Sequence, residues 1–285
     1  MTRMIKGSLL LGLLLLPMAI AFAQHDHHSP PKVLIVIREF LKPGKAGAPH
    51  ERTESGFVRA FQAAKWPQHY LAADSISGPA RSVFFVGYDS FAAWEKDTAD
   101  TAKNGTLSAA LGRATAADGE MLANYESSTF VYREDLSFQA DIDVSHARYF
   151  EITQFRIKPG HERDWEEIVK IYKDKYGKAV PDAHWAVFED MYGNASGGLF
   201  AVFTPMKSLA EVDESFGNSK KFAAAMGEDG MKKLSELISA TVESTQSNLL
   251  QFNPRISYPP DEWVKGDPFW KPATAPSAKA ANPAQ

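Results

Sequence analysis

The sequence contains no cysteine among its 285 residues. This excludes disulfide bonds, thiolate metal sites and a cysteine nucleophile. An excess of positive charge is also lacking, because 31 Lys and Arg residues are outnumbered by 35 Asp and Glu residues. Proteins that bind nucleic acids usually carry a basic face, so no nucleic-acid partner is expected. With 44% hydrophobic and 23% charged residues, the composition is that of a folded chain of one or two domains.

Three common motifs of cofactor binding and catalysis are missing as well. The sequence has no Walker-type phosphate loop, no G-x-G-x-x-G fingerprint and no G-x-S-x-G nucleophile elbow. Any chemistry must therefore come from side chains that the fold brings together.

Only one long apolar run is present, and it lies at the N-terminus. Arg3 and Lys6 precede the run Leu9–Leu16, and Ala21-Phe22-Ala23 matches an A-x-A cleavage pattern. The run is shorter than the roughly 20 residues that span a bilayer. Residues 1–23 are therefore predicted to be a signal peptide, with an uncleaved anchor as the alternative. We expect a secreted or periplasmic protein, cleaved near Ala23, with no stable membrane insertion afterwards.

The rest of the sequence contains an internal repeat. Short motifs of the first half recur in the same order roughly 115 residues later. Lys42-Pro43-Gly44 recurs as Lys158-Pro159-Gly160, His50-Glu51-Arg52 as His161-Glu162-Arg163, and His69-Tyr70 as His184-Trp185. The two halves are therefore expected to share one topology.

Each half follows a strand-helix-strand-strand-helix-strand pattern, which is the ferredoxin-like βαββαβ plan. Strands are predicted at 33–41, 69–77, 81–88 and 129–133, and again at 149–157, 184–191, 199–204 and 248–252, with long helical regions at about 90–126 and 207–243. We predict an α+β fold in which two tandem repeats, 32–135 and 148–253, pack their antiparallel sheets together as an intrachain α/β barrel. Two independent domains side by side are the alternative.

The remaining segments have compositions of their own. Residues 24–31 form a His-rich spacer, predicted to be flexible, whose His25–His28 cluster could bind a divalent metal ion. Residues 136–147 are predicted to link the repeats. Residues 254–272 are rich in Pro and aromatic residues and are predicted to lie across the body as a strap, or to dock a partner. Residues 273–285 are an Ala/Pro tail, predicted to be disordered.

The start of the second half resembles a known superfamily. Tyr149-Phe150-Glu151-Ile152, followed by Phe155–Gly160, resembles the opening of dimeric α/β-barrel proteins. Tyr88-Asp89-Ser90-Phe91 is similar to a step of the NIPSNAP branch. The superfamily includes antibiotic-biosynthesis-type monooxygenases, haem-degrading enzymes and EthD-like proteins, so the resemblance implies a fold rather than one reaction. The Asn/Trp/His constellation of haem-degrading members has no close match in this sequence.

His184 is the candidate catalytic residue, because an imidazole beside an aromatic residue could act as a base. Trp185 and Glu151 would add a flat wall and an acid. Further candidate ligand-binding residues are Gln154, Arg38, His69 and Tyr70. Inert strand-end histidines are the alternative reading of His69 and His184.

Polar residues inside strands require partners, and a cavity in the barrel would supply them. The polar residues in predicted strands are Arg38, Glu39, Glu151, Thr153 and Gln154. The alternative to a cavity is that they lie exposed at a sheet edge or form salt bridges on a sheet face. His50 and His161 are expected at the surface, where they would help to cap helices.

The sequence is compatible with three functions. The first is a protein that binds a small hydrophobic or aromatic ligand, as a monomer or homodimer and without a cofactor. The second is a cofactor-poor monooxygenase or isomerase that uses His184 as its base. The third is an exported haem- or metal-binding protein that uses a histidine, with no site residue assigned to a metal.

Overall fold

The computed structural model describes residues 29–193 and 198–271. The predicted signal peptide 1–23, residues 24–28 of the predicted spacer, and residues 272–285, which include the predicted tail, lie outside these described residues. In the first half the elements are β1 (Val33–Leu41), α1 (Ala48–Ala64), β2 (Leu71–Ser75), β3 (Arg81–Tyr88), α2 (Phe91–Lys103), α3 (Gly105–Gly119) and β4 (Leu122–Tyr132). In the second half they are β5 (Tyr149–Ile157), α4 (Glu162–Ala179), β6 (Ala186–Tyr192), β7 (Leu199–Met206), α5 (Ala210–Thr241) and β8 (Val242–Phe252). The repeated βαββαβ order is confirmed.

Local sequence explains several of these boundaries. The Lys-Pro-Gly turns end β1 and β5, since Gly44 and Gly160 adopt φ values of 74° and 85°, which disfavour other residues. In the first half Asn104 accepts a hydrogen bond from the Leu107 amide at 3.1 Å and starts α3 as a separate helix. The second half has a single α5 instead, with a kink at Gly227, where φ is 68°.

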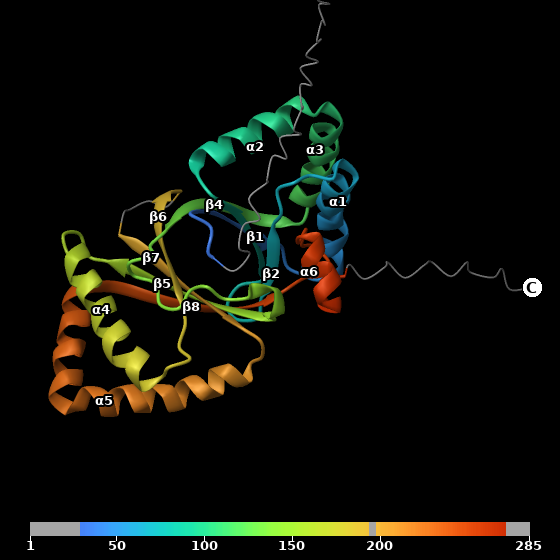
Figure 1. Ribbon diagram of the computed structural model, residues 1–285. Helices are drawn as coiled ribbons and strands as arrows, with labels where there is room; N and C mark the ends of the chain where they lie inside the picture. The colour runs from blue at the N-terminus through green and yellow to red at the C-terminus, as the bar shows by residue number, and fades with distance from the viewer. Residues whose placement is uncertain (1–28, 194–197, 272–285) are drawn as a thin grey trace, which may run out of the picture.

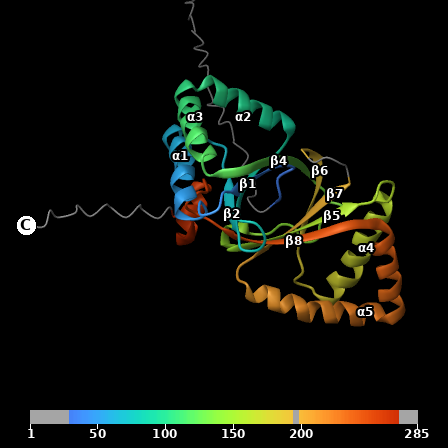
Figure 2. The same cartoon turned by 180° about the vertical axis from the view of Figure 1, so that it is seen from behind.

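The eight strands form one closed antiparallel barrel in the order β1-β3-β2-β8-β5-β7-β6-β4. Two seams join the halves. In one, Ala73 of β2 pairs with Phe252 of β8, and in the other, Val131 of β4 pairs with Glu189 of β6. Helices α1, α2 and α3 cover one side of the barrel, and α4 and α5 cover the opposite side (Figures 1 and 2). The predicted intrachain barrel is thus confirmed, with hydrogen-bonded seams joining its halves edge to edge.

The last strand of each half is longer than the sequence pattern predicts. β4 begins at Leu122 and β8 at Val242, although their first halves carry mainly exposed polar side chains. No apolar alternation marks these stretches. They are strands because they continue the ladders of β1 and β5, in which Leu41 pairs with Leu122 and Ile157 with Val242.

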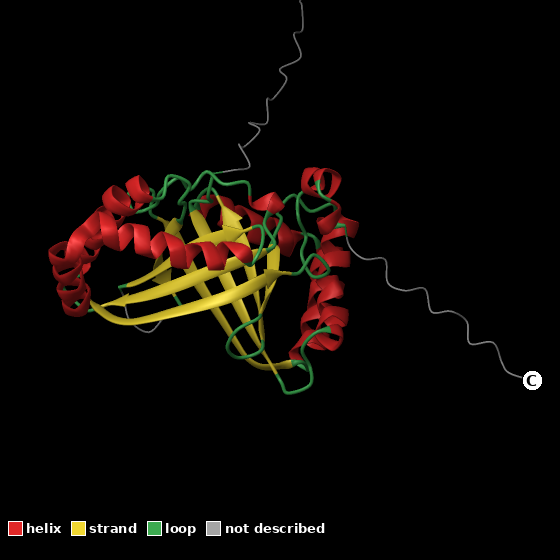
Figure 3. Ribbon diagram, turned by 90° about the horizontal axis from the view of Figure 1, so that it is seen from below, coloured by secondary structure: helices red, strands yellow, loops and turns green. Residues whose placement is uncertain are grey.

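The barrel interior is filled by side chains. Its core is largely aliphatic and aromatic and includes Leu34, Val36, Val83, Phe85, Phe130, Ile152, Phe188, Phe203, Leu250 and Phe252. Figure 3 shows the strands seen from below, with helices on both flanks. The sheet therefore buries its inner face against itself, and the outer face of each half is covered by the helices of that half.

The strap contains α6 (Asp261–Gly266) and a short 3-10 turn, Pro268–Trp270. Trp270 is fully buried in the barrel core, and its indole nitrogen donates to the Ser145 carbonyl at 2.6 Å. Arg148 forms an ion pair with Asp267 of the strap. The segment therefore completes the core rather than lying free.

Among the residues that the structure describes, no helix is both long and apolar enough to cross a bilayer.

Candidate ligand cavity and buried acidic cluster

A cavity of about 850 Å³ lies in the second half, between the outer face of the sheet and helices α4 and α5. Its walls include Glu151 and Thr153 of β5, Tyr172 of α4 and Ser215 of α5. It also includes His184 and Trp185, so three of the seven predicted site residues line the same cavity.

Aromatic rings form one wall of the cavity. Trp185 donates its indole N–H to the Leu136 carbonyl at 3.1 Å, and its ring lies 5.0 Å from that of Phe138. Tyr176 approaches Trp185 edge-on at 6.3 Å. These contacts fix the indole in place, and they leave a flat apolar surface toward the cavity.

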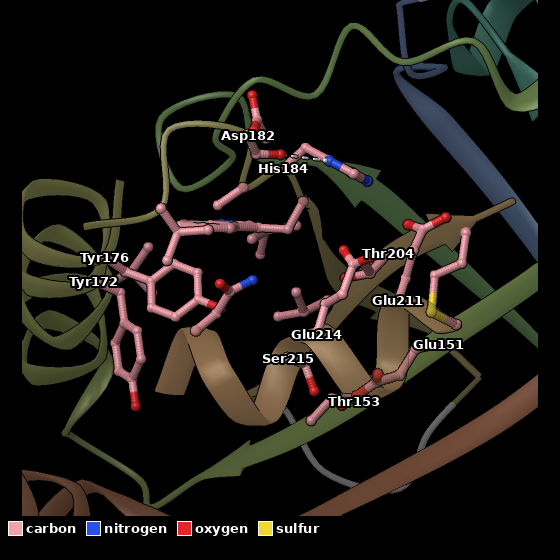
Figure 4. Close-up of a pocket in the computed structure, with 18 of the residues that line it drawn as sticks. Glu151, Thr153, Tyr172, Tyr176, Asp182, His184, Thr204, Glu211, Glu214 and Ser215 are labelled. Atoms are coloured by element: carbon pink, nitrogen blue, oxygen red, sulfur yellow. Dashed lines mark hydrogen bonds between the residues drawn. The ribbon is translucent and has the colours of Figure 1, made fainter. Parts of the chain in front are cut away.

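Carboxylates gather on the other side. Figure 4 shows Glu151, Glu211 and Glu214 across the cavity from Tyr172 and Tyr176. Glu151 accepts a hydrogen bond from the Thr153 hydroxyl at 3.2 Å, and Glu211 accepts one from the Lys207 amide at 2.7 Å. A carboxylate has about four acceptor positions, so both retain capacity for a ligand.

The overall charge of the cavity wall is negative. Four carboxyl groups line it, from Glu151, Asp182, Glu211 and Glu214, against one ammonium group, that of Lys221. The cavity therefore suits a ligand that carries positive charge.

His184 lies at the rim with both ring nitrogens facing main-chain oxygens. Its Nδ1 is 3.1 Å from the Asp182 carbonyl oxygen, and its Nε2 is 3.2 Å from the Pro205 carbonyl oxygen. Both nitrogens are therefore directed at main-chain oxygens. The catalytic role of His184 stays a prediction, and this geometry favours a role in shaping the rim.

The polar strand residues do not share one cavity, because they lie on both faces of the sheet. Successive residues of a strand point to opposite faces. Arg38 and Gln154 share the inner face with the core residues Val36 and Ile152, whereas Glu151 faces outward into the cavity. Arg38 is held inside by Glu126, at 3.3 Å, and by the Ser128 hydroxyl, at 2.7 Å. Neither Arg38 nor Gln154 lines the cavity.

His69 and Tyr70 lie in the first half, under the strap. The His69 ring is 4.8 Å from that of Tyr258, and its Nδ1 is 3.3 Å from the Tyr258 carbonyl oxygen. The Tyr70 hydroxyl is buried and makes no hydrogen bond. Burial and the nearby carboxylates of Glu54 and Glu39 raise its pKa well above the usual value.

His50 is not at the surface, contrary to expectation. Helix α1 begins at Ala48, so His50 falls inside its first turn and faces the sheet, where only 1% of the residue is exposed. Its Nε2 lies 3.1 Å from a carboxylate oxygen of Glu39, 3.3 Å from one of Asp118 and 3.9 Å from one of Glu54. By contrast, His161 remains partly exposed and pairs with Asp164.

These four residues, Glu39, His50, Glu54 and Asp118, are called the acidic cluster below. All four are buried. Burial raises the pKa of Glu39 and of Glu54. Burial also opposes the protonation of His50, but hydrogen bonds to Asp118 and Glu39 outweigh it and raise the pKa of the imidazole to about 10. The sequence contained one signal of this cluster, the polar Glu39 within an apolar strand.

Comparison with solved structures shows the same fold. A Fusobacterium nucleatum protein provisionally assigned as a monooxygenase matches with a TM-score of 0.50 and 13% identity, over 79% of this chain and 93% of that chain. An anthrone oxidase-like protein matches with a TM-score of 0.48 and 15% identity, over 78% and 92% of the two chains. A haem-binding protein from Thermus thermophilus matches with a TM-score of 0.43 and 11% identity, over 84% and 98%.

Identities this low show the fold alone, which is the dimeric α/β barrel, here closed within one chain. No protein-family model matches the sequence, and no curated protein matches it. The resemblance to the NIPSNAP branch stays a prediction.

Proposed function

We propose that the second half of the protein binds a small molecule with a flat, largely apolar body and a cationic group. The observation that carries this proposal is the cavity itself, with aromatic rings on one wall and carboxylates on the other. Pockets of about 300–1,000 Å³ hold compact organic ligands, and this cavity has about 850 Å³.

The two walls have complementary roles in this proposal. Trp185 and Tyr176 would stack on the body of the ligand, and ring faces also attract a nearby cation. Glu151, Glu211 and Glu214 would form charge-assisted hydrogen bonds with an ammonium or amidinium group. A neutral ligand would leave these carboxylates uncompensated, so the charge of the ligand decides its affinity.

Binding is favoured over base catalysis by the position of His184. A general base needs a nitrogen lone pair within reach of the substrate. Here both nitrogens face carbonyl oxygens at the rim. The same geometry disfavours haem, because haem needs an axial ligand and its propionates would meet a carboxylate-lined cavity.

Isothermal titration calorimetry with three indoles of matched shape tests the proposal. Tryptamine carries an ammonium group, indole carries no charge, and indole-3-acetate carries a carboxylate. We expect tryptamine to bind at least about tenfold more tightly than indole, with no measurable binding of indole-3-acetate. Equal affinity for all three would contradict the charge argument.

Two variants connect this binding to the cavity. Trp185→Ala should weaken tryptamine about tenfold, and Glu151→Gln should reduce the preference for tryptamine over indole. Tyr125→Ala is the control, because Tyr125 is an exposed aromatic residue of β4 outside the cavity. Unchanged tryptamine affinity in Trp185→Ala would show that the Trp185 side chain does not contact the ligand.

We further propose that the protein meets its ligand outside the cytoplasm. The basic start, short apolar run and A-x-A pattern of residues 1–23 support export. Sequencing the N-terminus of the protein from an extracytoplasmic fraction tests this, with Gln24 expected as the first residue. An intact Met1 there would contradict cleavage.

A further inference from the structure

The repeat makes the two halves directly comparable, and the acidic cluster is where they differ most. Glu39 is the seventh residue of β1, and Phe155 is the seventh residue of β5. Glu54 lies four residues after the His of its His-Glu-Arg motif, and Trp165 occupies the same place in the second half. The second half thus packs Phe155 against Trp165, with ring centroids 4.8 Å apart, where the first half places two buried carboxyl groups.

The His50 ring is oriented by hydrogen bonds on its far side. Ser82 donates its only hydroxyl proton to Asp74, and the Ser82 oxygen lies 3.3 Å from His50 Nδ1. The His50 Nδ1 therefore carries a proton and donates a hydrogen bond to the Ser82 oxygen. In the neutral imidazole this leaves the lone pair on Nε2, which faces the three carboxylates.

Such an arrangement favours a positive charge at its centre, either a proton on Nε2 or a metal ion bound by Nε2 and the carboxylates. A lone pair and three carboxylates repel one another in a site that water does not reach. In the described part of the chain, no Lys or Arg forms an ion pair with Glu39, Glu54 or Asp118, whose only ion-pairing partner there is His50. One oxygen of Glu54 is buried without any hydrogen-bond partner, 3.9 Å from His50 Nε2.

We propose that Glu39, His50, Glu54 and Asp118 bind one divalent transition-metal ion of the Zn²⁺, Mn²⁺ or Fe²⁺ class. Each residue offers one ligand atom, and the four atoms lie within 4.8 Å of one another. Ligand atoms around a tetrahedral ion are roughly 3.3 Å apart when each bond is about 2.0 Å. The distances from His50 Nε2 to Glu39 and Asp118, 3.1 and 3.3 Å, match this spacing.

The donor set selects the ion. One imidazole with three carboxylates suits Zn²⁺, Mn²⁺ and Fe²⁺, whereas Mg²⁺ and Ca²⁺ prefer oxygen ligands alone. Hydrogen bonds from neighbouring residues orient two of the ligands, as is usual in metal sites. The Thr53 hydroxyl donates to Asp118 at 2.7 Å, and the Ser82 oxygen lies 3.3 Å from His50 Nδ1.

The ion would have a structural role in this proposal. Four protein ligands and full burial are typical of closed, structural sites rather than catalytic ones. The ligands come from β1, α1 and α3, so the ion would hold both helices against the outer face of the first sheet. It would replace the apolar packing that Phe155 and Trp165 provide in the second half.

The test uses the full-length protein with His25, His27 and His28 changed to Ala, because those imidazoles could bind metal on their own. After treatment with EDTA and dialysis, ZnCl₂ is titrated by calorimetry and MnCl₂ by loss of the aqueous Mn²⁺ signal in electron paramagnetic resonance. We expect one ion per chain and a melting temperature that rises on metal addition and falls with EDTA. If neither Zn²⁺ nor Mn²⁺ binds saturably, the proposal is overturned. The positive charge in the cluster would then be the proton of His50.

Two variants place the ion in the cluster. Glu54→Gln keeps the shape of the side chain but removes a carboxylate ligand. Metal affinity should fall by at least about tenfold, because loss of a residue that only hydrogen-bonds to a ligand already has an effect of this size. Asp164→Asn is the control, since Asp164 pairs with His161, the exposed counterpart of His50 in the second half. Binding that survives Glu54→Gln, or that is lost in Asp164→Asn, would contradict the assignment. Circular dichroism of the metal-free variants checks that they fold.

Discussion

Trp185 and Phe138 are joined both by their main chains and by their rings. Each donates its amide N–H to the carbonyl of the other, at 2.9 and 3.0 Å, and the rings lie 5.0 Å apart. Gly177 of α4 makes room for this pair, because a Cβ atom there would lie 2.6 Å from the Phe138 ring. A residue between the two repeats thus supports the wall of the cavity in the second.

This relationship predicts that Phe138→Ala weakens ligand binding without removing any cavity-lining residue. Loss of the ring contact frees the indole of Trp185, so tryptamine affinity should fall about threefold, less than in Trp185→Ala. The free energy of unfolding should fall by about 2 kcal/mol. Calorimetry and urea unfolding measure both effects. Unchanged tryptamine affinity would mean that Trp185 holds its position alone.

His184→Ala should have little effect on ligand binding. A neutral imidazole has one N–H, so the substitution removes one hydrogen bond to a main-chain carbonyl, which contributes about 1 kcal/mol to stability. We expect the free energy of unfolding to fall by that order and tryptamine affinity to change less than about twofold. On any substrate later found for the protein, turnover should persist in this variant. A loss of turnover with intact binding would establish His184 as the base after all.

Added haem should give no saturable Soret band. The carboxylate-lined cavity and the engaged nitrogens of His184 offer haem neither favourable charge nor an axial ligand. Titration of hemin followed by absorbance measures this, with apomyoglobin as the positive control. A sharp band that saturates at one equivalent and disappears in His184→Ala would contradict the expectation.

The pair of Arg148 and Asp267 should make stability sensitive to acid. Burial raises the pKa of Asp267, but the Phe269 amide and the Arg148 guanidinium outweigh it, so the pKa lies below the usual 3.8. The folded state therefore favours the ionised carboxylate. This stabilisation is complete above about pH 5 and is lost as the pH falls through the lowered pKa.

Asp267→Asn isolates this contribution. At pH 7 the free energy of unfolding should fall by about 1–2 kcal/mol, and its decline between about pH 5 and pH 2 should become shallower. Urea unfolding at a series of pH values gives both quantities. Asp213→Asn, an exposed change on α5, is the control and should leave the profile as it is. Parallel profiles for the wild type and Asp267→Asn would rule out this pair as a source of acid sensitivity.

Trp270→Ala should be severely destabilising, although the residue lies near the C-terminus. The side chain is fully buried and packs against Phe252, Trp263 and Phe269. Its removal should lower the free energy of unfolding by about 3–5 kcal/mol. Phe216→Ala, at a position 66% exposed, should change it by less than about 0.5 kcal/mol. Similar losses in the two variants would mean that the strap does not contribute to the core.

The topology was predictable from the sequence because the repeat supplied two copies of each landmark. The Lys-Pro-Gly turns and the His-Glu-Arg motifs marked the same elements twice. What the sequence pattern could not show was on which face of the strand each polar residue lies in the closed barrel. Arg38 and Glu39 are neighbours in the sequence, yet one points into the barrel and the other into the acidic cluster.

The site was only partly predictable for the same reason. Trp185, His184 and Glu151 converge because the start of β6 and the outer face of β5 lie beside the same helices. Asp118 and Glu54 gave no signal, since carboxylates in helices are normally solvated. Their burial depends on how α1 and α3 dock on the sheet, which is a tertiary property.

The two seams of the barrel are made within a single polypeptide. In a barrel assembled from two chains, dilution would separate the halves, and any change in one half would appear in both. Here closure is unimolecular, so the barrel persists at any protein concentration. A substitution in one half leaves the other half unchanged, so the two flanks can differ, as the cavity of the second half and the buried carboxylates of the first do.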